Sequence, residues 1–391
     1  VTIGRMGNTT QNMSENARPV CGYIAMMADT SHGQTVDNIG SAYLLFTDNL
    51  GTGTSGSGYT VVGRDEGAMA IGFGYARFPA PWTLRYESFG RMMFDMASQV
   101  NERLEACRRF DAMIYDDANR LGDAAYADMC RAAYRQVIGA CKTAVSDTGS
   151  EFVYNFEAGG NNQISQADCI FLAAPLMLAY NPELAYRMYA AVPDYIKMFP
   201  GFSSPYGNAP HHLGQWPIMA GSHLDNGVDS TTDLCIVAYA AVAAGMPVDV
   251  IDDYSFSYLV SLCEYLDLFT LPQYQNNFPG EGSSDGGIRD NANLRLKSVL
   301  AMRSVARIAA LRGDTSDEEL CNEMAGRWEN IFREKYAAGD HYRHGTSVEW
   351  GMKYPLFYDR ALGFDIFKDV IDTELKYYAA QPTPEYGPAL N

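Results

Sequence analysis

Two carboxylates and a lysine are the side chains whose types and positions best fit catalysis. Asp168 stands near the start of an apolar stretch, and Asp229 precedes a second one. A carboxylate at a helix start gains about 0.3–1 kcal/mol from the helix dipole, or it serves as a general base or ammonium-binding group. Lys297 is either a solvated cation or the partner of a carboxylate or of a developing oxyanion. These three residues are the predicted catalytic groups.

The spacing of the acidic and histidine residues does not match a known metal-binding pattern. Asp225 and Asp229 have the acid spacing of a calcium loop, but the full ligand pattern is missing, so a structural turn is preferred. His211, His212 and His223 lack the i, i+4 pairing of a zinc helix. We therefore predict neither a metal nor another cofactor.

Six further residues have polar or aromatic side chains in or beside predicted loops, where a substrate cleft would lie. An aromatic residue at such a place is more often simply part of the core. We predict contacts with substrate for His211, Trp216, Asp225, Asn293, Lys353 and Tyr354.

The charge of the chain limits its partners. Its 391 residues include 47 acidic and 29 basic ones, which gives a formal net charge of −18. Such a chain repels phosphate-rich surfaces, so nucleic acid and membranes are not expected partners. No apolar stretch is long enough to span a bilayer, and no basic segment followed by an apolar core reads as a signal peptide in these 391 residues, which leaves the compartment open. A small molecule is the expected ligand.

The eight cysteines include no Cys-x-x-Cys pair, and most stand among apolar residues at helical spacing. Free cysteine behaves as a small hydrophobic residue. We therefore predict buried free thiols rather than a disulfide framework.

The pattern of apolar residues changes after the first 80 residues. Short runs rich in aliphatic and aromatic residues predict strands at 22–27, 42–46, 59–62 and 68–75. Apolar residues three, four and seven apart then predict a long helix from about 92 to 114 and further helices at 124–144, 166–179, 182–198, 231–244, 255–268, 292–311, 317–336 and 357–379. Residues 1–85 are thus predicted to be part of a β-sandwich. Residues 86–391 are predicted to be a catalytic α/α toroid with long loops, 199–229 and 272–291, at its open end.

Five sequence blocks resemble the glutaminase A family of bacteria and fungi. Residues 135–140 are similar to its Arg-Gln-Val-Phe-Gly helix, 167–175 to Val-Asp-Val-x-x-Pro-x-x-Pro, and 209–217 to Ala-Pro-His-Asp-Leu-Gly-x-x-Pro. Residues 291–297 resemble its Asn-x-x-Asn-Leu-x-x-Lys helix start, and 353–374 its penultimate segment. The resemblance implies a mainly α fold, an (α/α)6-type toroid preceded by part of a β-sandwich. It also implies an amidohydrolase that acts on the amide of glutamine or a related N-acyl compound.

Two departures from the family pattern bear on the substrate. The family's Val-Glu-Glu-x-Gly-Asn run aligns with residues 228–233, where one acid is shortened to Asp229 and the other is replaced by Ser230. His212 stands where the family has an aspartate. If those acids bind the amino group of the substrate, this protein prefers a different amide.

The end of the chain suggests a processed precursor. Residues 386–391 resemble the family's Tyr-Gly-x-Pro-Leu-Asp motif, with Asn391 in place of the aspartate, and the Ser-Arg that follows in the family is missing. One expectation is therefore cleavage after Asn391 and a second chain whose N-terminal serine is the nucleophile. The other is water activated by Asp168 or Asp229, with the second carboxylate as the acid.

Two other function classes stay open. Paired acids on an α/α barrel also suit glycoside hydrolysis, and the altered acidic run suits a non-catalytic protein that binds sugar or peptide. The compartment is open as well, because secretion in the family favours export while unpaired thiols fit a reducing compartment.

Overall fold

The computed structural model describes residues 3–6, 22–28, 35–38, 44–47, 60–65, 68–71 and 76–382, apart from 146–150, 156–162, 204–206, 216–217, 220–225, 270–289 and 347. Two compact units divide the chain. The first contains Val1–Ile138, Thr143–Phe152 and Trp216–Met219, and the second contains Gly139–Lys142, Val153–Gln215 and Ala220–Asn391. The predicted boundary near residue 85 stays a prediction.

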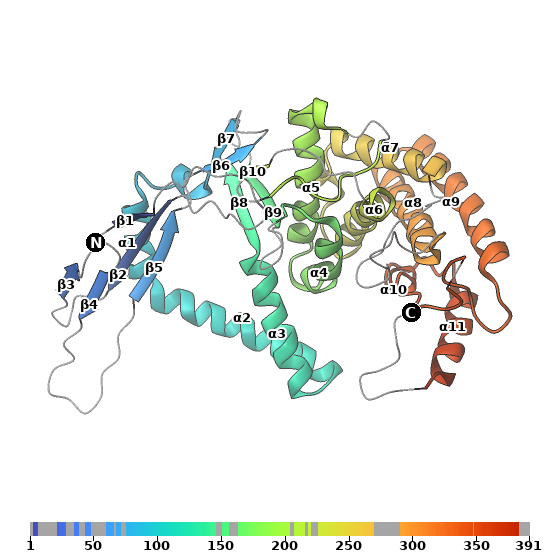
Figure 1. The fold of residues 1–391 in the computed structure, drawn as a ribbon, viewed down its shortest axis with the longest axis horizontal. Coiled ribbons are helices and arrows are strands. Elements are labelled where there is room, and N and C mark those ends of the chain that lie inside the picture. Colours follow the sequence, from blue (N-terminus) through green and yellow to red (C-terminus); the bar gives the residue numbers. More distant parts are fainter. Residues whose placement is uncertain are drawn as a thin grey trace. The chain divides into compact units, whose positions relative to one another are not determined.

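Short strands form the β part of the first unit (Figure 1). They are β1 (Ile3–Met6), β2 (Gly22–Ala28), β3 (Thr35–Asn38), β4 (Leu44–Thr47), β5 (Thr60–Asp65), β6 (Ala68–Ile71), β7 (Ala76–Pro79) and β10 (Ile218–Met219). Three sheets result, with the strand orders β1-β2-β5, β3-β4 and β10-β6-β7. Met26 lies opposite Val62 in the antiparallel register of β2 and β5. Each of the four predicted strands coincides with a strand of the structure.

Three helices follow the strands of the first unit, namely α1 (Phe89–Ser98), α2 (Val100–Leu121) and α3 (Ala124–Gly139). The Ser88 side chain accepts a 3.2 Å hydrogen bond from the backbone N–H of Arg91 and so caps α1. The prediction of one continuous helix there was wrong, because Gln99 leaves helical geometry at φ −106° and ψ 10°. The predicted continuation of α3 to residue 144 was also wrong. Cys141–Val145 instead forms strand β8, which pairs with β9 (Glu151–Asn155).

Helices make up the described part of the second unit almost entirely. They are α4 (Ala167–Tyr180), α5 (Pro182–Met198), α6 (Gly227–Ala243), α7 (Asp253–Phe269), α8 (Ala292–Arg312), α9 (Thr315–Tyr336), α10 (Leu356–Ala361) and α11 (Lys368–Ala380). Consecutive helices such as α4 and α5, or α8 and α9, pack as hairpins, while α4 packs on α6 and α6 on α8. These contacts define an inner row, α4, α6 and α8.

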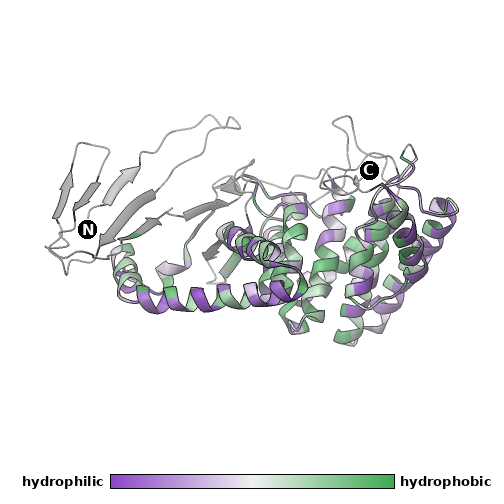
Figure 2. Cartoon of the chain, turned by 90° about the horizontal axis from the view of Figure 1, so that it is seen from below, coloured by the Kyte–Doolittle hydropathy of each residue, from purple (hydrophilic) through white to green (hydrophobic). Residues whose placement is uncertain are grey.

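Burial distinguishes the inner helices from the outer ones. Residues 292–302 of α8 are all buried, whereas α9 buries only Cys321, Met324, Ala325, Phe332 and Tyr336, which lie on one face at helical spacing. In Figure 2, α9 is the rightmost helix and is coloured largely as hydrophilic. An inner helix that is buried all round forces any polar residue on it into the core.

Helix α6 begins earlier than predicted, at Gly227 instead of residue 231. Asn226 takes the left-handed conformation (φ 55°) just before it, which asparagine tolerates better than most residues. A Cβ at Gly227 would lie 2.7 Å from Asn208 Nδ2, so a larger residue would have to displace the Asn208 side chain. Asp229 therefore belongs to the first turn of a helix and not to a loop, with Asp233 one turn later.

The predicted helix at 357–379 is in fact two, α10 and α11. Gly363 and Asp365 have φ values of 66° and 53°, which ends α10 and turns the chain. The Asp359 carboxylate accepts hydrogen bonds from the backbone N–H groups of Ile366 (3.2 Å) and Phe367 (3.1 Å). This buried carboxylate thus fixes the connection between the two helices.

Thiols and membrane-spanning potential were also predicted from the sequence. Every cysteine in the described ranges is free. Burial was predicted for them all but holds only for Cys235, Cys263 and Cys321, since Cys107 is exposed and the other three are half-buried. None of the described helices combines the length and hydrophobicity that crossing a bilayer requires.

The environment of Asp194, in α5, makes the free energy of unfolding depend on pH. Burial, and next the charge of Asp252, raises the pKa of Asp194 to about 6. A carboxyl group with a raised pKa in the folded state stabilises the protein below its unfolded pKa, and this contribution is lost as the pH rises through about 6. We expect Asp194→Asn to raise the free energy of unfolding by about 2–3 kcal/mol at pH 7.5 and to change it little at pH 4. Urea titrations at both pH values measure this.

The matched control for Asp194→Asn is Asp116→Asn, which alters an exposed carboxylate in α2. It should leave the pH dependence of the free energy of unfolding unchanged. An equal effect of Asp194→Asn at pH 4 and at pH 7.5 would contradict the raised pKa.

Candidate active site

The first turns of the inner helices bring the predicted catalytic residues into one region. Asp168 lies in the first turn of α4, Asp229 in the first turn of α6, and Lys297 in the second turn of α8. Because α6 packs on both α4 and α8, these helix starts are neighbours. The positive ends of α4 and α6 stabilise the two carboxylates.

Lys297 lies at the centre of a buried charge cluster. Its Nζ forms ion pairs with Asp229 and Asp233, and the three side chains are only 1%, 3% and 0% exposed. The same Nζ lies 4.3 Å from the centre of the Phe171 ring in α4, a cation–π contact. The alternative that Lys297 is merely solvated is therefore wrong, because α8 is an inner helix at this point.

The protonation of this cluster follows from its burial. Burial lowers the pKa of Lys297. The negative charges of Asp229 and Asp233, and the hydrogen bonds that Lys297 donates to them, have a larger effect and raise this pKa above its usual value. Burial raises the pKa of Asp229, although the charge of Lys297 acts to lower it. Burial also raises the pKa of Asp233, well above its usual range. The ammonium group is thus kept, while Asp233 is the carboxyl group that holds a proton most readily.

A second pair, Asp168 and His211, is more accessible. His211 Nε2 lies 3.4 Å from Asp168 Oδ1, and each side chain is 10% exposed. The backbone N–H of Cys169 donates to Asp168 Oδ1 at 2.9 Å. The backbone carbonyl of His211 accepts a 2.9 Å hydrogen bond from the N–H of Ala167, which ties the histidine loop to the start of α4. Asp168 and His211 are therefore held together by both backbone and side chains.

Electrostatics and aromatic contacts join the two groups into one site. The charges of Asp168 and His211 both act on Asp229, as that of Lys297 does. Phe171 contacts the Tyr358 ring at a centroid distance of 4.9 Å, and the Tyr189 hydroxyl donates to the Ala167 carbonyl at 2.6 Å. Aromatic side chains thus enclose the charged groups and lower the local dielectric.

Asn293 and Lys353, two predicted substrate contacts, meet beside the start of α8. Asn293 Nδ2 donates to the Met352 carbonyl at 2.9 Å, and Lys353 Nζ donates to the Gly351 carbonyl at 2.7 Å. Lys353 also lies 3.7 Å from a carboxylate oxygen of Glu374. These contacts attach segment 351–353 to α8 and α11. A role in substrate binding stays a prediction for both residues, as it does for the half-buried Tyr354.

The same segment packs tightly on a buried histidine. Burial, and next the charge of Lys353, lowers the pKa of His344 to about 3, so its ring is neutral. A Cβ at Gly351 would lie 2.7 Å from His344 Cγ, which is closer than real contacts allow. We expect Gly351→Ala to lower the free energy of unfolding by about 1–3 kcal/mol, as overpacking does. Urea denaturation measures this loss.

Gly326→Ala is the control for that substitution. Nothing lies within 4 Å of a Cβ built on Gly326 in α9, so alanine should stabilise the protein by about 0.5–1 kcal/mol through helix propensity. If Gly351→Ala behaved like Gly326→Ala, the close packing on His344 would be contradicted.

Some predicted residues fall outside the described ranges, and some site residues were missed. Trp216 and Asp225 lie among the residues that the structure does not describe. Phe171, Tyr358 and Asp233 were not predicted. The spacing of Asp229 and Asp233, four residues apart, would have indicated a shared helix face if the helix had been placed from Gly227.

The described residues do not bring together three His, Cys, Asp or Glu side chains that could hold a metal ion. Asp168, His211 and the Lys297 cluster can transfer protons and stabilise charge.

Comparison with known families identifies the helical part of the chain. Residues 123–391, from the start of α3 onward, match the family described as the glutaminase A six helical-hairpin domain. The chain belongs to the glutaminase A family. The match confirms the resemblance found in the sequence and the predicted mainly α helical toroid preceded by strands. No curated protein matches the chain. Asp168, His211, Asp229 and Lys297 all lie within the glutaminase A domain.

Proposed function

We propose that this protein is a glutaminase-like amidohydrolase whose substrate is the amide of glutamine or of a related N-acyl compound. The observation that carries the proposal is the Asp168–His211 pair beside the buried Lys297 cluster, within the glutaminase A domain. Water is a weak nucleophile and an amide nitrogen is a poor leaving group, so amide hydrolysis needs a base for water and an acid for the leaving nitrogen.

In the proposed reaction Asp168 removes a proton from water as the water oxygen bonds to the amide carbon. His211 then gives a proton to the leaving nitrogen as the carbon–nitrogen bond breaks, which yields a carboxylate and ammonia or an amine. Asp168 and His211 are assigned these roles because their side chains are the more exposed ones of the site. Their 3.4 Å separation lets the proton that Asp168 accepts return to His211 after turnover.

The Lys297 cluster has a different role in this proposal. At 1% exposure, Lys297 does not reach substrate directly, and Asp229 at 3% is similarly enclosed. We assign both to positioning, because their charges act on the site through a low-dielectric interior. The ammonium group of Lys297 then favours the negative charge that develops on the amide oxygen.

The test is a substrate panel assayed for ammonia, amine and reducing sugar. Release of ammonia from L-glutamine, or of amine from an N-acyl amino acid, supports the proposal. Release of reducing sugar from glycosides would contradict it and favour glycoside hydrolysis. Stabilisation by sugars or peptides without any turnover would also contradict it and favour a binding protein. Glycoside hydrolysis requires two carboxyl groups on opposite sides of the bond. Of the predicted pair, Asp168 and Asp229, the second is only 3% exposed and forms an ion pair with Lys297.

The competing expectation, a processed precursor, rests on residues 386–391, which lie outside the described ranges.

A further inference from the structure

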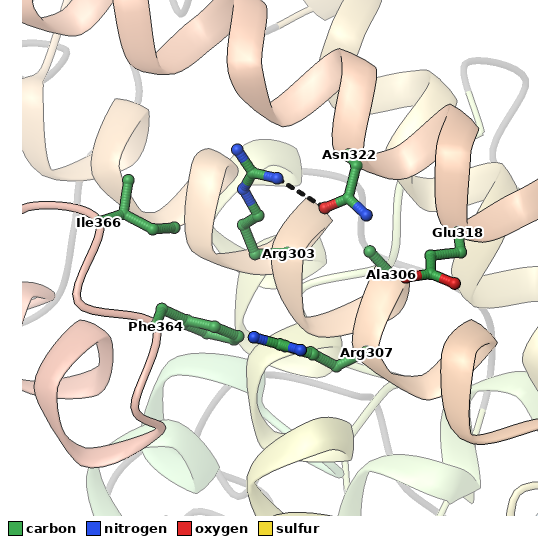
Figure 3. Close-up of a pocket in the computed structure, with 7 residues that line it drawn as sticks. All are labelled: Arg303, Ala306, Arg307, Glu318, Asn322, Phe364 and Ile366. Atoms are coloured by element: carbon green, nitrogen blue, oxygen red, sulfur yellow. Dashed lines mark hydrogen bonds between the residues drawn. The ribbon is translucent and has the colours of Figure 1, made fainter.

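A cavity lies in the second unit, and none of the candidate-site residues lines it (Figure 3). Its volume is about 310 Å³, and its walls come from α8, α9 and the segment between α10 and α11. Two residues that line the cavity, Arg303 and Arg307, lie on the same helix as Lys297. Their distances from Lys297 along the axis of α8 are about 9 and 15 Å, at 1.5 Å per residue. Such a volume is at the lower end of the range for sites that bind small molecules.

Charged groups of both signs line this cavity. Arg303 is fixed, because its Nη1 donates to Asn322 Oδ1 at 2.6 Å and its Nη2 donates to Glu329 Oε2 at 3.4 Å. Arg307 and Glu318 differ from it, since neither side chain has a hydrogen bond or ion pair with another residue in the described ranges. Among the described residues the cavity thus has one cation, the exposed Arg307, and one anion, the half-buried Glu318, that have no such partner.

Polar donors and an apolar wall complete the lining. The Asn322 amide accepts from Arg303 through Oδ1, which leaves its Nδ2 as a donor. Phe364 is held by stacking on Tyr239, with ring centroids 5.6 Å apart, and Ile366 extends the apolar side. Figure 3 shows the Arg307 guanidinium group directed toward the Phe364 ring, whereas Glu318 lies beside Ala306, away from that ring.

We propose that this cavity binds a small zwitterion, an α-amino acid with an apolar side chain. Its carboxylate would bind Arg307 and the Asn322 amide, its ammonium group would bind Glu318, and its side chain would pack on Phe364 and Ile366. A polyanion fits less well, because Glu318 and the net charge of −18 repel it. A ligand with a positive charge and no negative one is repelled by the positive charge of Arg307. The site does not depend on the proposed hydrolase activity.

Isothermal titration of the full chain tests this with three probes of one shape. L-phenylalanine carries both charges, 3-phenylpropionate lacks the ammonium group, and phenethylamine lacks the carboxylate. L-phenylalanine should bind at least about tenfold more tightly than either analogue. Titrating Asp168→Asn as well separates this cavity from the candidate active site, because binding to the cavity should persist there.

Two substitutions in the cavity give opposite signatures. Arg307→Met should lower the affinity for L-phenylalanine at least about tenfold. Arg109→Met, which removes an exposed arginine of α2, should leave this affinity unchanged. Glu318→Gln should weaken the binding of L-phenylalanine and strengthen the binding of 3-phenylpropionate, so the difference in affinity between the two probes becomes smaller. Equal affinity for the three probes, or unchanged L-phenylalanine binding in Arg307→Met, would overturn the proposal.

Discussion

Replacing Lys297 by methionine is expected to lower the free energy of unfolding by about 3–5 kcal/mol, the usual loss when one partner of a buried ion pair is removed. Asp229 and Asp233 would lose their cation while staying enclosed, since their side chains are 3% and 0% exposed. The cation–π contact with Phe171 would be lost too. Guanidinium chloride denaturation at pH 7.5 measures the change.

Two further variants make the Lys297 result specific. Lys197→Met removes a lysine whose pair with Asp252 is 52% exposed on both sides, and such surface pairs contribute about 0–1 kcal/mol. The triple variant Lys297→Met, Asp229→Asn, Asp233→Asn removes all three ionisable groups and should recover part of the lost stability. A loss below about 1 kcal/mol in Lys297→Met alone would contradict the buried ion pairs.

Asp168→Asn is expected to lower kcat for amide hydrolysis by about 10²–10⁴-fold, the range in which a general base contributes. KM should change little, because the proposed role of Asp168 is exerted on water rather than on substrate binding. The amide of asparagine can still accept the hydrogen bond from the Cys169 N–H, so the free energy of unfolding should fall by no more than about 1 kcal/mol. Initial rates over a range of substrate concentration, together with denaturation curves, measure both.

The matched control is Asp369→Asn. Asp369 lies in the first turn of α11 and is 62% exposed, so its substitution removes a helix-start carboxylate away from the site. It should leave kcat unchanged. A purely structural role for Asp168 would show instead as a loss of stability with kcat per folded molecule preserved, and that result would contradict the proposed base.

Local sequence signals predicted some helices well. The bounds of α5 follow from Pro182 in its first turn and from the Asn181 side chain, which accepts from the Leu184 N–H at 3.1 Å. The end of α8 follows from Gly313, whose φ of 79° suits glycine. Long-range effects were missed: the carboxylate of Asp359 and the left-handed Asp365 separate α10 from α11, although both residues continue an apparently helical pattern.

The candidate site was predictable only in part, for a related reason. Asp168, His211, Asp229 and Lys297 were identified from their residue types and from family blocks. Which charges are buried could not be predicted, because lysine on a helix is usually solvated and only the packing of α8 between neighbours encloses Lys297. Phe171 and Tyr358 come from helices far apart in the sequence, so their contact depends on tertiary structure.

The most direct test of the proposed hydrolase measures ammonia released from L-glutamine and amine released from N-acyl amino acids by purified wild-type protein, Asp168→Asn and His211→Gln. The proposal predicts turnover of at least one amide by the wild type and a loss of at least about 100-fold in each variant, with all three proteins folded. Amide turnover that is unchanged in both variants, or absent from the wild type across the panel, would contradict an amidohydrolase site at Asp168 and His211.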